Sequence, residues 1–298
     1  MNNMLFVMNP FAGQRKANRH LADILTIFNR AGFQVSVHMT AGPGDCARVV
    51  AERAGSVDLV VCCGGDGTFN EAVNGLLESK ADVPIGYIPA GSTNDFAASL
   101  KLPADHLEAA RAIVDGTPMA YDICRFGQRY FAYVASFGAF TRASYATSQS
   151  MKNILGHTAY LLEGISELGQ IHKTHARFTL GDGTVIEDDF IFGAISNSTS
   201  LGGILTLDPK QVDMSDGLFE LLLVRAPKDL SEIAECIRAL RSQKYNCRML
   251  TFLPASQATI EADAGLVWTL DGERAQGTDQ IEAENLHHAI RLMQKVTP

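Results

Sequence analysis

The sequence predicts an α/β fold at the start of the chain, a parallel sheet with helices on both faces, followed by a larger β-rich, mostly antiparallel part. Up to about residue 116, short apolar runs alternate with helical patterns at regular spacing, which is typical of strand–helix–strand units. Beyond that point, strand-like runs follow one another across short Gly- and Asp-containing turns, which is typical of antiparallel sheets. This change of rhythm predicts two domains, 1–122 and 123–290.

Four strands and their connecting helices account for the first domain. The expected strands are 4–8, 34–39, 58–63 and 84–88, and the expected helices are 16–31, 45–54, 69–77, a short one from residue 95 or 96, and 105–115. Apolar residues recur at helical spacing in the first helix, at Leu21, Ile24, Leu25 and Phe28. In parallel sheets ligands lie outside the carboxyl ends of the strands, so the loops that follow these four strands are expected to converge.

The second domain is expected to consist of hairpins with two helices. A hairpin is expected from 119–126 and 129–137 around Gly127-Gln128, helices at 152–168 and 229–241, and strands at 175–181, 184–196, 218–225, 248–253, 257–262 and 265–270. The eight histidines show no metal-ligand spacing, and His287-His288 is interpreted as part of a terminal strand rather than as a ligand pair.

The most informative stretch is 59–70, LVVCCGGDGTFN. A short apolar run that ends in glycines before a helix presents backbone N–H groups at a helix N-terminus, which suits a phosphate. The tetrapeptide GDGT also occurs at Gly181–Thr184, where it lies between two strand-like runs and reads as an ordinary hairpin turn. The tetrapeptide alone is therefore weak evidence, and the additional Gly64 and the strand–helix context carry the prediction.

Charge, hydropathy and cysteine content limit the classes of function that the chain can have. The 298 residues carry a formal net charge of −8, which argues against a nucleic-acid partner. No apolar run is long enough to span a bilayer, and Met1–Met4 lacks the pattern of a secretory signal. Six cysteines without Cys-x-x-Cys spacing predict reduced, buried thiols in a cytoplasmic protein, and the adjacent Cys62 and Cys63 should face opposite sides of a strand.

An ordered set of motifs runs along the chain. In order, these are Asn9-Pro10-x-x-Gly13, Gly64-Gly65-Asp66-Gly67-Thr68-x-Asn70-Glu71, Pro89-x-Gly91-Ser92-Thr93-Asn94-Asp95-Phe96-Ala97, Asn197 with Gly202-Gly203, Asp213-x-x-Asp216-Gly217-Leu218-Phe219, and Leu270-Asp271-Gly272-Glu273. This set resembles the diacylglycerol kinase catalytic family, particularly the soluble bacterial lipid kinases, over nearly the whole chain. Ser92 stands where many members have Thr, a departure that keeps the hydroxyl group.

The resemblance implies a lipid kinase that transfers the γ-phosphate of ATP to a lipid hydroxyl, with diacylglycerol as the expected substrate and phosphatidic acid as the product. It implies an active site in a cleft between the two domains, and a final segment, 291–298, that can return to the first domain. It further implies a cytoplasmic protein that contacts the inner face of the membrane peripherally, and it is compatible with a homodimer.

The ATP-binding residues that the resemblance implies lie in the first domain. They are Asn9, Pro10, Phe11, Ala12, Gly13, Thr40, Gly64, Gly65, Asp66, Gly67, Thr68, Phe69, Asn70 and Thr93. Backbone N–H groups and small hydroxyls around a polyphosphate are the physical basis. On local pattern alone, Thr40 could be a strand-end residue and Asn9-Pro10 a turn.

Acidic residues are expected to hold magnesium. The resemblance implies that Asp66, Asp95 and Asp122 hold a catalytic Mg²⁺, partly through water, which suits the preference of this ion for carboxylates and retained waters. Local pattern leaves other interpretations open. Asp66 could be a turn residue, Asp95 a helix N-cap and Asp122 a surface acid in a strand.

A second magnesium site is implied by resemblance at Asp213, Asp216 and Leu218. The Asp216 side chain would bind the ion together with the main-chain carbonyls of residues 213 and 218. The alternative is that Ser215-Asp216-Gly217 is simply a turn that enters a strand.

Glu273 is the candidate general base of the transfer. It follows the tight turn Asp271-Gly272 and would take the proton from the lipid hydroxyl, whereas spacing alone favours a solvent-facing hairpin residue. The aromatic-rich segment 137–168 is a candidate lipid-facing surface, and a helix packed on its own domain is the alternative.

Three other functions stay open at this stage. The acceptor could be phosphatidylglycerol or a sphingoid base. The motif Gly64-Gly65-Asp66-Gly67 also occurs in NAD kinases and phosphofructokinases, so a soluble acceptor is a second reading. A nucleotide- or lipid-binding regulator without turnover is the third, and the presence of Asp66 and Glu273 argues against it.

Overall fold

A computed structural model describes the protein, with all residues described except 1, 14–15, 139–172, 202–204 and 296–298. The chain divides into two compact units. Unit 1 comprises Met1–Ile123 and His287–Pro298, and unit 2 comprises Cys124–Leu286. The chain passes from one unit to the other within two long strands, β5 (Thr117–Phe126) and β17 (Gln280–Gln294).

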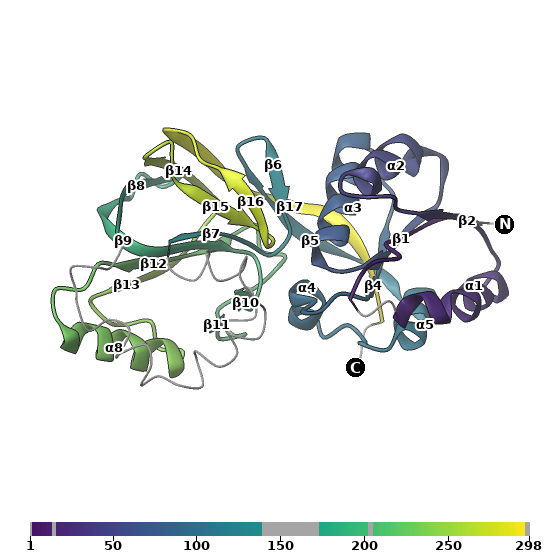
Figure 1. The fold of residues 1–298 in the computed structure, drawn as a ribbon, viewed down its shortest axis with the longest axis horizontal. Helices are drawn as coiled ribbons and strands as arrows, with labels where there is room; N and C mark the ends of the chain where they lie inside the picture. Colours follow the sequence, from purple (N-terminus) through teal and green to yellow (C-terminus); the bar gives the residue numbers. More distant parts are fainter. Residues whose placement is uncertain (1, 14–15, 139–172, 202–204, 296–298) are drawn as a thin grey trace. The chain divides into compact units, whose positions relative to one another are not determined.

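Unit 1 contains a parallel sheet in the order β2-β1-β3-β4 (Figure 1). Its strands are β1 (Asn2–Met8), β2 (Phe33–Met39), β3 (Leu59–Gly64) and β4 (Ile85–Pro89). The end of β17 joins this sheet in parallel, with Leu292 opposite Ile85. The last strand of the chain therefore completes the sheet that the first strands began.

Helices cover both faces of this sheet, with α1 and α5 packed together on one face and α2 and α3 on the other (Figure 1). The helices are α1 (Leu21–Arg30), α2 (Asp45–Arg53), α3 (Asp66–Ser79), α4 (Asp95–Ser99) and α5 (His106–Asp115), with the 3-10 turns η1 (Lys16–His20) and η2 (Ala54–Ser56). Met4, Phe6 and Met8 belong to the core that includes residues of α1 and α5, and the alternate residues Leu5 and Val7 are equally buried. Cover on both faces explains why β1 reads as a continuous apolar run.

Most of the cysteines are buried, as the sequence predicts. All six are free thiols, and five are buried. Cys63 lies in the core that includes residues of α1 and α5, whereas Cys62 hydrogen-bonds Cys46 of α2. The two neighbours therefore face opposite sides of β3, as strand geometry requires.

Unit 2 is built mainly of antiparallel strands in the order β16-β15-β7-β9-β8-β14-β17, with β12 pairing β9 and β13. The strands are β6 (Arg129–Phe131), β7 (Val134–Gly138), β8 (Thr174–Leu180), β9 (Val185–Ser196), β12 (Phe219–Arg225), β13 (Leu250–Ala255), β14 (Gln257–Ala262), β15 (Val267–Leu270) and β16 (Glu273–Gln276); the short pair β10 (Ser200–Leu201) and β11 (Leu205–Thr206) forms a separate ribbon. The single helix among the described residues of this unit is α8 (Leu230–Arg241). The predicted fold class, parallel α/β followed by a larger antiparallel part, is confirmed.

The core of unit 2 is aromatic. Trp268, the one tryptophan of the chain, is almost fully buried, and its ring lies 4.6 Å from that of Phe126 and 4.8 Å from that of Phe137. Glycine at position 193 accommodates this packing, because a Cβ there would collide with the Phe137 ring. Trp268 therefore reports directly on the packing of this unit.

Two hairpins match the sequence prediction, and one strand differs from it. Gly181–Thr184 is the turn between β8 and β9, with Gly183 at φ +87°, and Gly127 at φ +60° lies in the turn between β5 and β6. The expected strand 129–137 is instead divided into β6 and β7. The reason is that the N–H groups of residues 132–134 bind the Asp271 carboxylate instead of continuing the ladder.

Three further expectations concern the helices of the chain. The first helix begins as a 3-10 turn at Lys16 and becomes α-helical only at Leu21. The expected helix 152–168, and with it most of the candidate lipid-facing segment 137–168, lies outside the described residues. Among the helices that are described, none combines the length and the apolarity needed to cross a bilayer.

Candidate active site

The carboxyl ends of β1, β3 and β4 bring three of the predicted loops together in unit 1. The Asn9 backbone N–H donates to the Cys63 carbonyl (2.9 Å), and its side-chain amide donates to Thr68 Oγ1 (3.1 Å). The Ala90 N–H donates to the Gly64 carbonyl (2.7 Å). The first, second and third motifs are thus neighbours at one edge of the sheet.

Glycines permit this close approach. A Cβ on Gly91 would lie 2.6 Å from the Gly65 Cα atom, and a Cβ on Gly64 would lie 2.5 Å from the Thr68 Cβ atom. Gly13 combines φ +50° with a position against the Ala90 carbonyl, where no side chain fits. Only bare backbone is therefore compatible with the contact between the β3–α3 and β4–α4 loops.

Helix α3 begins earlier in the chain than the sequence pattern predicted. The sequence pattern placed residues 64–68 in a loop and started the helix at Phe69, but α3 begins at Asp66, and the Phe69 N–H donates to the Gly65 carbonyl (3.0 Å). The N–H groups of Asp66, Gly67 and Thr68 therefore form the first turn, and no side chain caps it. Such a turn suits an anionic ligand such as phosphate.

Phe69 and Asn70 contribute differently from the small residues around them. The Phe69 ring is fully buried and stacks on the rings of Tyr87 (4.4 Å) and Phe96 (4.6 Å). The Asn70 side-chain oxygen and carbonyl both accept from the Asn74 amide, at 2.8 Å. The Phe69 side chain is thus a packing element that holds α3 against β4 and α4.

Thr40 and the Asn9–Gly13 loop complete the predicted set. Thr40 is buried at the end of β2, and its N–H donates to the Met8 carbonyl (2.9 Å). The Asn9 side-chain oxygen accepts the Phe11 N–H (2.9 Å), which closes a turn, as the local Asn-Pro pattern also allowed. The Phe11 side chain is exposed. Pro10 and Ala12 are partly buried within the same loop.

Asp66 and Asp95 lie close together in this loop cluster. The Asp66 carboxylate accepts the Thr93 hydroxyl (3.2 Å) and the Phe96 N–H (3.3 Å), and it also receives the Asp95 N–H. Burial raises the pKa of Asp66, and the negative charge of Asp95 raises it further. Two neighbouring buried acids fit a divalent cation, because a bound positive charge would relieve both effects.

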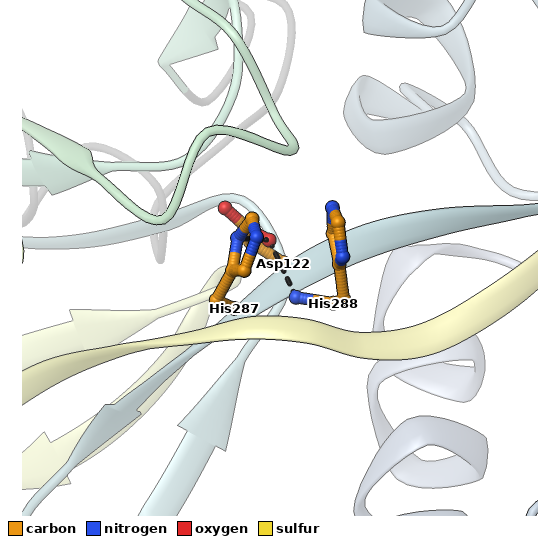
Figure 2. A group of neighbouring side chains, drawn as sticks. All are labelled: Asp122, His287 and His288. Atoms are coloured by element: carbon orange, nitrogen blue, oxygen red, sulfur yellow. Dashed lines mark hydrogen bonds and ion pairs between the residues drawn. The ribbon is translucent and has the colours of Figure 1, made fainter.

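Asp122 lies in β5 of unit 1, beside two histidines. Asp122 is fully buried in β5, not a surface acid, and its Oδ1 atom accepts the His288 N–H (2.7 Å) and lies 3.1 Å from His287 Nδ1 (Figure 2). His287 and His288 are part of the terminal strand, as predicted. Together with Asp122 they form a group in which one potential ligand atom of each residue lies within 4.8 Å of the others.

The predicted second metal position lies in unit 2, at the turn before β12. The Asp213 carboxylate accepts the Ser215 N–H (3.0 Å) and that of Asp216 accepts the Leu218 N–H (2.9 Å), so the segment is a turn, as the pattern also allowed. The Leu218 carbonyl accepts the Asn285 amide (2.7 Å).

Glu220 is a residue at this turn that the sequence did not single out. It is almost fully buried, and its Oε2 atom has no hydrogen-bond partner. Burial raises the pKa of Glu220 to about 8, with a further contribution from the charges of Asp216 and Asp213. An unpartnered buried carboxylate oxygen next to two acids fits a cation at this turn. The available signal was an acid within a run of apolar residues, from Phe219 to Val224.

Glu273 begins β16 directly after a tight turn in unit 2. Asp271 (φ +48°) and Gly272 (φ +85°) both have positive φ, the pattern of a type I′ hairpin turn. The Asp271 carboxylate is buried and accepts the N–H groups of Ala132 (2.6 Å), Tyr133 (3.0 Å) and Val134 (3.0 Å). The Glu273 side chain is half-exposed and pairs with Arg129 (3.1 Å). The turn is thus anchored by Asp271 and leaves the Glu273 carboxylate accessible.

Two motif residues with structural roles were not assigned from sequence. Asn94 has φ +54°, and its side chain binds both the N–H (2.8 Å) and the carbonyl (3.2 Å) of Gly91, so it shapes the β4–α4 loop. Glu71 accepts the N–H groups of Gly44 (2.8 Å) and Cys46 (3.2 Å) and thereby caps α2. Asparagine tolerates a left-handed backbone, which was the signal available for Asn94.

Comparison with known proteins places the chain in a family. The family model for the diacylglycerol kinase catalytic domain matches residues 3–126. The chain is 31% identical to the diacylglycerol kinase of Bacillus subtilis (strain 168) over 295 residues, 98% of this chain and 96% of that protein. It is 32% identical to the diacylglycerol kinase of Staphylococcus aureus (strain MRSA252) over 270 residues, 90% of this chain and 84% of that protein.

The fold agrees with this relationship. A crystal structure of a diacylglycerol kinase from Bacillus anthracis (str. Sterne) matches with a TM-score of 0.76 at 22% identity, covering 99% of this chain and 97% of that chain. The matched family and these relatives identify an ATP-dependent phosphotransferase that acts on a lipid. The chain belongs to the diacylglycerol kinase family.

Proposed function

We propose that this lipid kinase transfers the γ-phosphoryl group of ATP to the hydroxyl of diacylglycerol, which yields phosphatidic acid and ADP. The observation that supports this substrate is the 31% identity to a protein named diacylglycerol kinase over 98% of the chain. In the reaction, the lipid oxygen bonds to the γ-phosphorus, the bond from that phosphorus to the bridging oxygen breaks, and the hydroxyl proton leaves.

The loops of unit 1 are the proposed ATP-binding surface. The first turn of α3 would bind phosphate oxygens through the N–H groups of Gly67 and Thr68, with Asn9 holding the Thr68 side chain in place. The contact between Gly65 and Gly91 would keep side chains away from the phosphates. Thr40 and Thr93 add small hydroxyls to the same edge, and Phe69 acts through its packing.

Acidic residues are the proposed magnesium ligands. Asp66 and Asp95 would hold the catalytic ion, with Asp122 as the third acid of the set, and a bound Mg²⁺ would neutralise charge on the transferring phosphoryl group. At the second position, the Asp216 carboxylate and the carbonyls of Asp213 and Leu218 would hold a structural Mg²⁺. Glu220 supports that assignment, because its buried Oε2 atom has no other partner.

Glu273 is the proposed general base. Its half-exposed carboxylate can accept a proton, and the anchored Asp271-Gly272 turn fixes the position from which it acts. The pairing with Arg129 is between two exposed groups and is weak enough to be exchanged for a substrate hydroxyl.

The lipid is expected to be reached at a membrane surface. The proposed enzyme is a cytoplasmic protein that contacts the inner face of the membrane peripherally, and homodimerisation is part of the proposal. Co-sedimentation with lipid vesicles and analytical ultracentrifugation measure these two properties. A protein that stays in the supernatant with all vesicles, or sediments only as a monomer, contradicts them.

The test of the reaction is transfer of labelled γ-phosphate in mixed micelles that contain diacylglycerol, phosphatidylglycerol or a sphingoid base, with NAD and sugars as soluble acceptors. Label in phosphatidic acid is expected. Label in another lipid, in a soluble acceptor, or in none of them while ATP still binds would each reject the diacylglycerol assignment.

The base is tested by Glu273→Gln. We expect kcat to fall by about 10²- to 10⁴-fold with ATP binding unchanged, because only proton transfer is lost. Glu261→Gln is the matched control, since the Glu261 side chain is also 51% exposed and lies near an arginine in unit 2. Unchanged turnover in the Glu273 variant would remove that residue from its role.

A further inference from the structure

We propose that Asp122, His287 and His288 form a binding site for a divalent transition-metal cation of the zinc class. The three side chains gather where β5 and β17 run side by side in unit 1 (Figure 2). Among the residues that the structure describes, these three are a group of possible metal ligands. One potential ligand atom of each residue lies within 4.8 Å of those of the other two.

The backbone of β17 departs from regular strand geometry to create this group. Adjacent residues of a strand normally face opposite sides, which would separate the two imidazoles. His288 instead has φ +55°, and the rings of His287 and His288 stack with their centroids 3.6 Å apart. A left-handed conformation is unfavourable for a residue other than glycine. Strain of this kind is typical of functional positions, so the stacked pair is a feature to be explained.

Asp122 anchors the pair from the neighbouring strand. Its buried Oδ1 atom accepts the His288 N–H (2.7 Å), which stabilises the left-handed backbone, and lies 3.1 Å from His287 Nδ1. Both imidazole rings are exposed, so an ion can reach their nitrogen atoms from solvent. One buried carboxylate and two accessible imidazoles thus come from strands that are held together by hydrogen bonds.

The donor set identifies the class of ion. Imidazole nitrogen suits Zn²⁺ and the neighbouring transition metals, whereas Mg²⁺ prefers oxygen ligands. Bonds of about 2.0–2.1 Å in a tetrahedral site place ligand atoms about 3.3 Å apart. Rotation of the exposed imidazoles can bring the present separations into that range. Three protein ligands leave one coordination position for water or another small ligand.

This site shares Asp122 with the magnesium set proposed above, but its test needs neither ATP nor lipid. The enzyme is first freed of metal with a chelator that is then removed. Co²⁺ is added in the presence of about 10 mM Mg²⁺, and the visible absorption of the bound ion is followed. We expect saturation at one equivalent and displacement of Co²⁺ by Zn²⁺. No saturation below about 1 mM Co²⁺, or suppression of binding by Mg²⁺, would overturn the proposal.

Two variants locate the ion. His288→Asn removes the imidazole and keeps a residue that tolerates the left-handed backbone, and His287→Gln removes the other ring without changing that backbone position. Each variant is expected to weaken Co²⁺ binding ten-fold or more. His20→Asn is the control, because His20 lies in a second histidine pair, with His106 at 5.6 Å, outside this group. Binding that stays unchanged in both test variants, or weakens equally in the control, would refute the assignment.

Discussion

The turn that carries Glu273 is expected to depend on Asp271, and this dependence can be measured directly. The Asp271 side chain is 4% exposed, and its two oxygens accept three backbone N–H groups, at 2.6, 3.0 and 3.0 Å. Alanine at this position would leave those three donors without their acceptor. Each buried donor that loses its partner costs about 1–3 kcal/mol, so Asp271→Ala should destabilise unit 2 by about 3–9 kcal/mol.

A loss of this size approaches the whole stability of a domain, which is typically about 5–15 kcal/mol. Asp271→Asn provides a milder test. Asparagine tolerates the φ of +48° and keeps one oxygen, which can accept the two 3.0 Å bonds, while its amide group would face the Ala132 N–H. We expect this variant to lose about 1–3 kcal/mol, the cost of one unpaired donor.

Urea unfolding followed by the fluorescence of Trp268 is the appropriate assay, since this sole tryptophan lies in the core of unit 2, three positions before Asp271. Asp182→Ala is the matched control. Asp182 also lies in an Asp-Gly hairpin turn, but it is exposed and accepts one N–H, from Thr184 (2.8 Å). Little change is expected there. If Asp271→Ala unfolds at the same urea concentration as wild type, the three hydrogen bonds do not hold this turn.

Two other predictions concern pH and the glycine contact. In the folded protein without metal, burial and then the charge of Asp216 raise the pKa of Glu220 from its ordinary value of 4.5 to about 8. The experiment is done in EDTA, which keeps the enzyme free of metal. The associated stability is complete below pH 4.5 and is lost as the pH rises towards 8. Between pH 6 and pH 8, the free energy of unfolding in urea should therefore fall by about 2 kcal/mol more for wild type than for Glu220→Gln. An equal fall in the two proteins would contradict the burial argument. Gly91→Ala should weaken ATP binding about ten-fold or more in calorimetry, because the added Cβ would lie 2.6 Å from the Gly65 Cα atom. Gly55→Ala is the control and should bind ATP normally, since a Cβ there meets nothing within 4 Å. A Gly91→Ala variant that binds ATP as well as wild type would show that the two loops can separate.

Local pattern was sufficient for most of the fold. The alternation of apolar runs and helical spacing predicted the strands of unit 1 and their helices, because period and turn residues are properties of neighbouring positions. The same holds for the hairpin at Gly181–Thr184 and for the turn at Ser215–Gly217. The start of α3 was misplaced by three residues, because Asp66-Gly67-Thr68 reads as a loop until the helical bond from the Phe69 N–H to Gly65 is seen.

The candidate site was likewise predicted only in part from the sequence. The ordered motifs, which are a property of the sequence alone, determined the family and named Asp66, Asp95 and the glycine loops. What these residues touch was decided by the tertiary structure. Sequence could not indicate that Gly65 and Gly91 meet through their backbones, or that Glu220 is buried without a partner for its Oε2 atom.

Asp122 illustrates the physical reason most clearly. The sequence supplied an acid in one strand and a histidine pair 165 positions later. Only folding made Asp122 fully buried, set His288 at a left-handed φ, and brought one ring nitrogen of each histidine within 4.8 Å of the Asp122 carboxylate. Strand period and turn chemistry are local and can be read along the chain, whereas burial and the meeting of distant strands depend on the packing of the whole unit.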